Sequence, residues 1–108
     1  MKNNLSRVIQ GCMNWGQWGS KLTADEMESL IHHNLEIGIS SFDHADIYGD
    51  YTTEQEFGRA FSNSGINRES IQLISKCGIQ YVGKTRRNKV KHYQYDAEYI
   101  IYSAEKSI

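Results

Sequence analysis

The sequence has no apolar run approaching the roughly 20 residues that a membrane-spanning helix needs, and its amino terminus lacks the apolar core of a signal peptide. It also lacks an excess of charge. The 12 Lys and Arg residues and the 13 Asp and Glu residues leave a formal net charge of -1. This balance gives no overall attraction to nucleic acid or to an anionic membrane. We therefore expect a cytoplasmic protein without a nucleic-acid or membrane partner.

Cysteine is scarce, with only Cys12 and Cys77 among the 108 residues. The two residues lie near the ends of the first and third strands that the sequence predicts. Strands two places apart in a parallel sheet are separated by about 9 to 10 Å, at ~4.8 Å per step, which exceeds the reach of a disulfide. We expect two free thiols, buried or partly buried, as is usual in a reducing compartment.

Internal repeats and low-complexity tracts are absent as well. The composition, with 39% hydrophobic and 23% charged residues, is that of an ordinary globular domain and excludes intrinsic disorder on compositional grounds. A chain of this length is sufficient for one domain. We therefore interpret residues 1–108 as parts of a single domain.

Apolar periodicity predicts three units of strand followed by helix. The strands are expected at residues 7–12, 39–42 and 71–75, and the helices begin near Thr23, Thr52 or Thr53, and Asp96. Thr23 and Glu26 form a capping box, and Gly38 ends the first helix. Each predicted helix has one apolar face. These faces consist of Met27, Leu30, Ile31 and Leu35 in the first helix, Phe57, Ala60 and Phe61 in the second, and Ile100, Ile101, Ala104 and Ile108 in the third. This alternation predicts right-handed crossovers and a parallel sheet.

An acid, a phenol and a lysine occupy positions that such a sheet brings together. Asp43 and Lys76 each follow an expected strand, and Tyr48 lies in the connection between them. A phenol has a reference pKa of about 10, and a neighbouring ammonium lowers it. Asp43 is expected to hold a buried Lys76 charged and oriented. The three residues therefore predict a general acid/base on an alcohol or carbonyl oxygen.

Each residue by itself also has a plainer interpretation. Asp43 suits a helix-entry acid, Tyr48 a half-buried aromatic residue and Lys76 a solvated charge. Their joint placement at strand ends favours the chemical interpretation. His44 directly follows the acid and is expected to supply a strand-end hydrogen bond. A metal site is not favoured, because no suitably spaced second and third ligands accompany it.

The sequence resembles the amino-terminal part of an aldo-keto reductase, in particular that of the bacterial oxidoreductase branch. The matching pieces are Gly11 after the first strand, residues 42–49 (Phe-Asp-His-Ala-Asp-Ile-Tyr-Gly), residues 53–60 (Thr-Glu-Gln-Glu-Phe-Gly-Arg-Ala) and residues 73–78 (Leu-Ile-Ser-Lys-Cys-Gly). The resemblance runs from about Ser6 to the last residue and is weakest between Gln80 and Gln94. Together the pieces make a specific signal.

This resemblance implies an α/β fold made of roughly the first three βα units of a (β/α)8 TIM barrel. It also implies an NADP(H)-dependent oxidoreductase that reduces aldehydes or ketones to alcohols. Three members of the family's catalytic tetrad correspond to Asp43, Tyr48 and Lys76, where Tyr48 is the general acid. The residues after the first strand, Gly11, Cys12 and Met13, are candidates for cofactor binding.

One part of the family pattern has no counterpart in this sequence. The tetrad histidine is not matched by any of His32, His33, His44 or His92. A barrel of this type has about 250 residues, and its phosphate site comes from loops after strands seven and eight. We therefore expect an incomplete barrel domain that is inactive alone. Its open sheet edges favour self-association or pairing with a complementary carboxyl-terminal fragment, and the family's substrate is a small carbonyl compound.

Three further features of the sequence bear on function. Residues 84–91 carry five basic side chains, which suit either a solvated loop or an anion-binding site. The solvated loop is favoured because the rest of the chain is not basic, and a non-catalytic interaction or anion-binding module is the alternative function. Trp15 and Trp18 suit either a pocket at the barrel mouth or loop packing against the rim. The adjacent pair His32 and His33 is expected on a solvated helix face.

Overall fold

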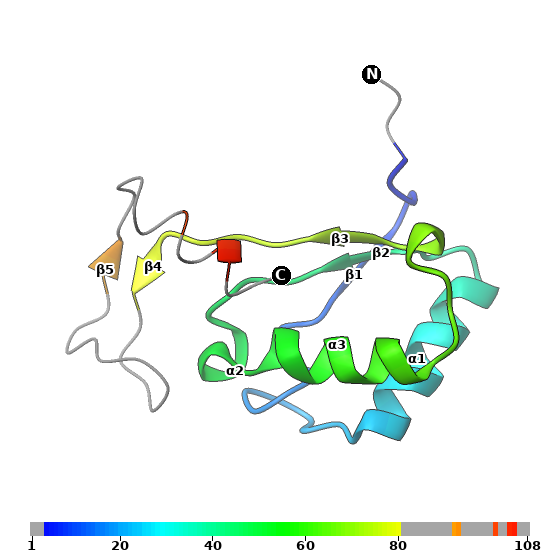
Figure 1. Cartoon of the computed structure of the whole chain (residues 1–108), viewed down its shortest axis with the longest axis horizontal. Helices are drawn as coiled ribbons and strands as arrows, with labels where there is room; N and C mark the ends of the chain where they lie inside the picture. The colour runs from blue at the N-terminus through cyan, green and yellow to red at the C-terminus, as the bar shows by residue number, and fades with distance from the viewer. Residues whose placement is uncertain (1–3, 81–91, 94–100, 102–103, 106–108) are drawn as a thin grey trace.

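The computed structural model describes residues 4–80, 92–93, 101 and 104–105. Its centre is a parallel sheet in the order β1-β2-β3, formed by Ile9–Gly11, Ser41–Asp43 and Gln72–Ile74 (Figure 1). The strands are in register, so that Gly11, Asp43 and Ile74 form one row at their carboxyl ends. The parallel arrangement and the strand order agree with the sequence prediction.

The strands are shorter than predicted. Ile39 was expected in the second strand, but its amide donates to the carbonyl of Asn34 and it belongs to the turn that leaves the helix before it. Beyond the strand ends, single hydrogen bonds still join neighbouring segments: Cys12 N donates to Asp43 O at 3.0 Å, and His44 N donates to Ile74 O at 2.8 Å. The pairing therefore continues into the loops that carry the candidate site.

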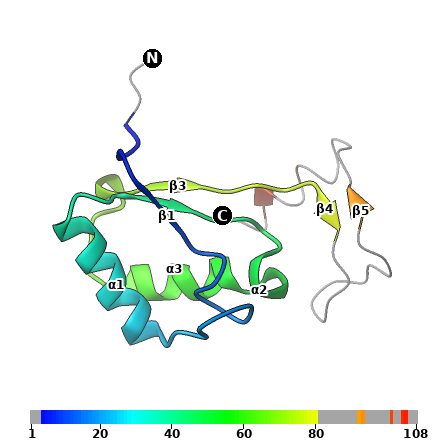
Figure 2. The same ribbon diagram turned by 180° about the vertical axis from the view of Figure 1, so that it is seen from behind.

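Two helices cover one face of the sheet. The helices α1, Ala24–Glu36, and α3, Thr53–Asn63, pack against each other below the strands, as both views show (Figures 1 and 2). Between β2 and α3 lies the one-turn element α2, Tyr48–Tyr51, which contains left-handed residues, and a 3-10 turn, η1, spans Arg68–Ser70. The sequence did not predict α2. None of the described helices has both the length and the apolar character that crossing a bilayer requires.

The first helix begins and ends where the sequence predicts. Thr23 Oγ1 accepts from Glu26 N at 3.1 Å, and Glu26 Oε1 accepts from Thr23 N at 2.9 Å, which completes the capping box. Gly38 has a φ of 88°, a left-handed conformation that glycine adopts without a steric penalty. Both termini of α1 are thus determined by local sequence.

The core lies between the sheet and the two helices. Its buried residues are Cys12, Trp15, Met27, Ile31, Phe42, Phe57, Ala60 and Ile71. The rings of Phe42 and Phe57 lie 5.4 Å apart, which ties β2 to α3. Leu30, Leu35 and Phe61, predicted on the apolar helix faces, are only partly buried against this core.

A two-stranded antiparallel sheet follows β3. It consists of β4, Ile79–Gln80, and β5, His92–Tyr93, and it was not predicted. The basic residues 84–91 and the predicted start of the third helix at Asp96 lie outside the described residues. Of the predicted apolar positions of that helix, Ile101 and Ala104 are described, and both side chains are exposed.

Candidate functional site

The three residues predicted to form the site come from three neighbouring segments. Asp43 is the last residue of β2, Tyr48 is the first residue of α2, and Lys76 lies two residues beyond the end of β3. Because β2 and β3 are parallel and in register, Asp43 pairs with Ile74 in the sheet. This pairing brings Lys76 to the same edge as the acid.

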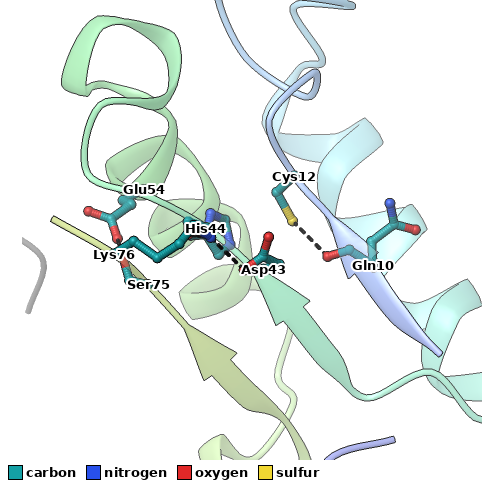
Figure 3. A network of polar contacts seen from close by, with 7 residues as sticks. All are labelled: Gln10, Cys12, Asp43, His44, Glu54, Ser75 and Lys76. Carbon is teal, nitrogen blue, oxygen red and sulfur yellow. Dashed lines mark hydrogen bonds and ion pairs between the residues drawn. The ribbon is translucent and has the colours of Figure 1, made fainter. Parts of the chain in front are cut away.

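Lys76 holds the site together. Its Nζ atom donates to Asp43 Oδ1 at 2.6 Å and to the backbone carbonyl of His44 at 2.6 Å (Figure 3). The same atom lies 5.5 Å from the centroid of the Tyr48 ring. The structure therefore brings Asp43, Tyr48 and Lys76 together, as the sequence predicted. Their arrangement places a cation between a carboxylate and a phenol.

The ion pair is more exposed than the sequence analysis expected. The side chain of Lys76 is 49% exposed and that of Asp43 is 35% exposed, so the expectation of a buried cation was wrong. The reason is that β3 is an edge strand of the described sheet, and Lys76 extends beyond its end. Burial lowers the pKa of Lys76, but the hydrogen bond that Lys76 donates to Asp43 and the nearby Tyr48 outweigh it and raise that pKa above 10.5.

His44 lies behind the ion pair and faces the core. Side chains alternate across a strand, so the residue after Asp43 points toward the helices. The ring of His44 is 3% exposed and lies edge-on to Phe57, with 4.4 Å between centroids. Among the described residues its ring nitrogens have no hydrogen-bond partner, and burial lowers its pKa to about 4. The expected strand-end hydrogen bond is made by its backbone carbonyl instead.

A left-handed turn follows Tyr48 directly. Gly49, Asp50 and Tyr51 have φ angles of 62°, 57° and 66°. A side chain at positive φ is strained, and two of these three residues have one. The turn is held by Thr52 Oγ1, which donates to Gly49 O at 2.5 Å, and by Thr52 N, which donates to Tyr48 O at 3.2 Å. It sets the direction in which the chain leaves Tyr48.

The two tryptophans differ in environment. Trp15 is buried and packs edge-on against Phe42 at 6.3 Å, so it belongs to the core. Trp18 is 37% exposed, and its ring lies 6.2 Å from the ring of Tyr48. Loop packing therefore describes Trp15, whereas Trp18 borders the candidate site.

The residues after β1 occupy the adjoining edge of the sheet. Gly11 pairs with Asp43, and a Cβ atom built on Gly11 would meet no atom within 4 Å. Met13 is 45% exposed. Cys12 is fully buried, and burial together with the nearby Asp43 raises the pKa of its thiol to about 12. The edge of the sheet therefore has free space at Gly11, beside Asp43, whereas the side chain of Cys12 is packed in the core.

Other predicted features are also placed by the structure. Cys12 and Cys77 are both free, as expected, but Cys77 is exposed rather than buried because it follows Lys76 beyond the edge strand. His32 and His33 are exposed on α1, in agreement with a solvated face. In the described part of the chain no group of three or more His, Cys, Asp or Glu residues is arranged to hold a metal ion.

Comparisons with known proteins show which family this chain resembles. Residues 7–108 match the model of the aldo/keto reductase family. The oxidoreductase YdhF of Escherichia coli is 37% identical over 103 residues, which are 95% of this chain and 34% of YdhF. The uncharacterized oxidoreductase YcsN of Bacillus subtilis is 40% identical over 104 residues, again 95% of this chain and 34% of the relative.

The fold is similar to that of a solved glycerol dehydrogenase from Gluconobacter oxydans. The TM-score is 0.75 at 27% identity, and the likeness covers 99% of this chain and 32% of that chain. This confirms the predicted fold class, part of a (β/α)8 barrel. The chain spans about a third of the length of the curated relatives it matches. The family match over residues 7–108, on a parallel sheet with the acid, the phenol and the lysine at one edge, shows that this chain belongs to the aldo/keto reductase family.

Proposed function

We propose that this chain supplies the acid/base residues for the NADP(H)-dependent reduction of an aldehyde or ketone to an alcohol. The observation that carries the proposal is the position of Lys76 Nζ, 2.6 Å from Asp43 Oδ1 and 5.5 Å from the centroid of the Tyr48 ring. Membership of the aldo/keto reductase family supports the reaction class, and relatives such as YdhF are named oxidoreductases.

Tyr48 is the proton donor in this proposal. As a hydride reaches the carbonyl carbon, negative charge develops on the carbonyl oxygen, and the Tyr48 hydroxyl donates its proton to that oxygen. The ammonium of Lys76 stabilises the phenolate that remains. Asp43 keeps the ammonium charged and directed toward the phenol, in agreement with the raised pKa of Lys76. The phenolate then takes a proton from solvent and the site returns to its starting state.

The residues after β1 fit one border of a cofactor site. The space beside Asp43 is open at Gly11, where an added Cβ atom would meet nothing within 4 Å, and Met13 presents an exposed apolar side chain nearby in sequence. Gly11 and Met13 are therefore the residues that would border a nicotinamide ring, whereas the side chain of Cys12 is buried and its amide already donates to Asp43 O. When bound, NADP(H) supplies the hydride.

The proposal includes two expectations about the chain as a whole. We expect the 108 residues alone to have little or no turnover, because three strands provide only part of the cofactor-binding surface of an eight-stranded barrel. We also expect a cytoplasmic location, where a reducing environment keeps thiols such as Cys12 and Cys77 free.

The test is a chimaera in which this chain replaces the matching third of YdhF. NADPH oxidation is measured with a panel of small aldehydes and ketones, and NADPH binding is followed by nicotinamide fluorescence. Tyr48→Phe should lower kcat by about 10² to 10⁴, the usual contribution of general acid catalysis, and leave NADPH binding unchanged. The same measurements on the 108-residue chain test whether it is active alone.

Tyr51→Phe is the matched control. Tyr51 follows Tyr48 by three residues, and its hydroxyl donates to Ile79 O at 3.5 Å. This variant should retain most of the activity. Equal activity of the Tyr48→Phe chimaera and its parent would show that Tyr48 is not the acid. Turnover by the 108-residue chain, lost in Tyr48→Phe, would show that the expectation of inactivity is wrong.

A further inference from the structure

Lys76 lies where strand pairing alone does not hold it. It follows β3 by two residues, and its side chain is 49% exposed. On the side of β2 its backbone is anchored by one hydrogen bond, in which Asp46 N donates to Lys76 O at 3.0 Å. A further contact to the segment after β3 would therefore help to keep Lys76 Nζ close to its two acceptors.

A side-chain hydrogen bond supplies that restraint from the other direction. Ser75 Oγ donates to Glu54 Oε2 at 2.5 Å, and Figure 3 shows Glu54 and Ser75 beside Lys76. A hydrogen bond to a carboxylate is stronger than one between neutral groups. Glu54 is in the first turn of α3, where the helix dipole favours a negative charge. The contact joins the amino end of α3 to the residue before Lys76.

The same contact relates Lys76 to Tyr48. Helix α3 begins five residues after Tyr48, directly after the left-handed turn, so its first turn and Tyr48 belong to one connected segment. Asp43 acts on the lysine from β2, and the hydrogen bond between Ser75 and Glu54 acts from α3. The lysine is thus restrained from both neighbouring elements.

We propose that Glu54, acting through Ser75, is a positioning residue that holds Lys76 between Asp43 and Tyr48. This inference rests on the proposed function, because it names what keeps the proposed acid/base residues in place. The titratable groups that face Lys76 are Asp43 from β2 and Tyr48 from α2, with Cys12 and His44 behind them and Glu54 beyond Ser75. Loss of the restraint lets the ammonium move away from Asp43 and into solvent.

The experiment measures Lys76 directly in the 108-residue chain and does not depend on turnover. The titration midpoint of Lys76 is followed by ¹³C NMR of its ε carbon, and exchange of the Asp46 amide is followed at neutral pH. Ser75→Ala removes the donor, Ser75→Thr keeps the hydroxyl, and Glu54→Ala removes the acceptor. Because Ser75 is exposed, Ser75→Ala should leave the fold intact.

Ser75→Ala and Glu54→Ala should each lower the midpoint of Lys76 toward 10.5 and speed exchange of the Asp46 amide by about tenfold. Ser75→Thr should resemble the unmodified chain. The double variant should be no worse than Ser75→Ala, because both changes remove one interaction. A general loss of structure would instead change exchange throughout the sheet.

Asp43→Asn separates the two proposals. If it lowers the midpoint of Lys76 while Ser75→Ala and Glu54→Ala change neither readout, Glu54 is not a positioning residue and the proposed acid/base arrangement stands. If the unmodified chain has an ordinary lysine midpoint that Asp43→Asn does not move, the charge pair itself fails, and both proposals are overturned.

Discussion

Lys76 Nζ lies 2.6 Å from Asp43 Oδ1, although 33 residues separate the two in the sequence. The distance follows from the in-register pairing of β2 with β3, which places Asp43 opposite Ile74. Half-exposed ion pairs of this kind contribute only about 0 to 1 kcal/mol to stability. The pair is therefore better understood through the phenol beside it than as a structural support.

The ion pair predicts a loss of stability at alkaline pH. The pKa of Lys76 is raised in the folded chain, so its stabilising contribution is complete below the unfolded value of 10.5 and is lost as the pH rises through the folded value. Urea unfolding at several pH values between about 9 and 12 should show this loss. The Asp43→Asn variant should be less stable than the parent near pH 9, and the two stabilities should become equal near pH 12. A constant difference would contradict the linkage.

The buried imidazole of His44 predicts a loss of stability at acidic pH. His44 has a pKa of about 4 in the folded chain against 6.5 in the unfolded chain, because burial disfavours the cation. Above pH 6.5 the ring is neutral in both states and folding requires no deprotonation, and stability falls as the pH drops from 6.5 to about 4. The loss attributable to this group is about 3 kcal/mol. Unfolding measured by circular dichroism across this range tests the expectation.

His44→Leu removes the titrating group and keeps a similar volume against Phe57. Its stability should fall less steeply between pH 6.5 and 4 than that of the parent. The exposed His33 is the matched control, and His33→Leu should retain the slope of the parent. If both variants keep the full slope, some other group is responsible for the acid dependence.

Local sequence predicted much of the fold because the decisive interactions are local or periodic. The capping box of Thr23 and Glu26, the stop at Gly38 and the parallel order of the strands all follow from spacing along the chain. The grouping of Asp43 with Lys76 followed as well, because parallel strands end at a common edge.

The features that were missed depend on contacts between distant residues. The antiparallel pairing of β4 with β5 joins segments that have no hairpin signal. The exposure of Cys77 depends on the edge position of β3, and the restraint on Ser75 depends on Glu54, which is 21 residues away. The burial of His44 could have been predicted, because side chains alternate along an extended segment and His44, which directly follows β2, faces the opposite side from Asp43.

Replacement by alanine should have opposite effects on stability at two glycines, one in the loop after Tyr48 and one in α3. Gly49 has a φ of 62°, and a Cβ atom there would overlap Thr53 Oγ1. Gly49→Ala should therefore destabilise the chain by about 1 to 3 kcal/mol. Gly58 lies inside α3, where a Cβ atom would meet nothing within 4 Å. Gly58→Ala should stabilise the chain by up to about 1 kcal/mol. Thermal unfolding of both variants decides whether the loop is as tightly packed as the structure indicates.

The two thiols should react at very different rates. Cys77 is exposed, whereas Cys12 is fully buried with a pKa of about 12, and the thiolate is the reactive form. A disulfide reagent added to the native chain should modify one thiol quickly, and the second should react only after unfolding in urea. Cys77→Ser should abolish the fast phase, and Cys12→Ser should leave it unchanged. Rapid modification of Cys12 in the native Cys77→Ser variant would contradict this expectation, because it would mean that the core beside Asp43 opens readily. The free space at Gly11 would then reach farther toward the helices than the structure indicates.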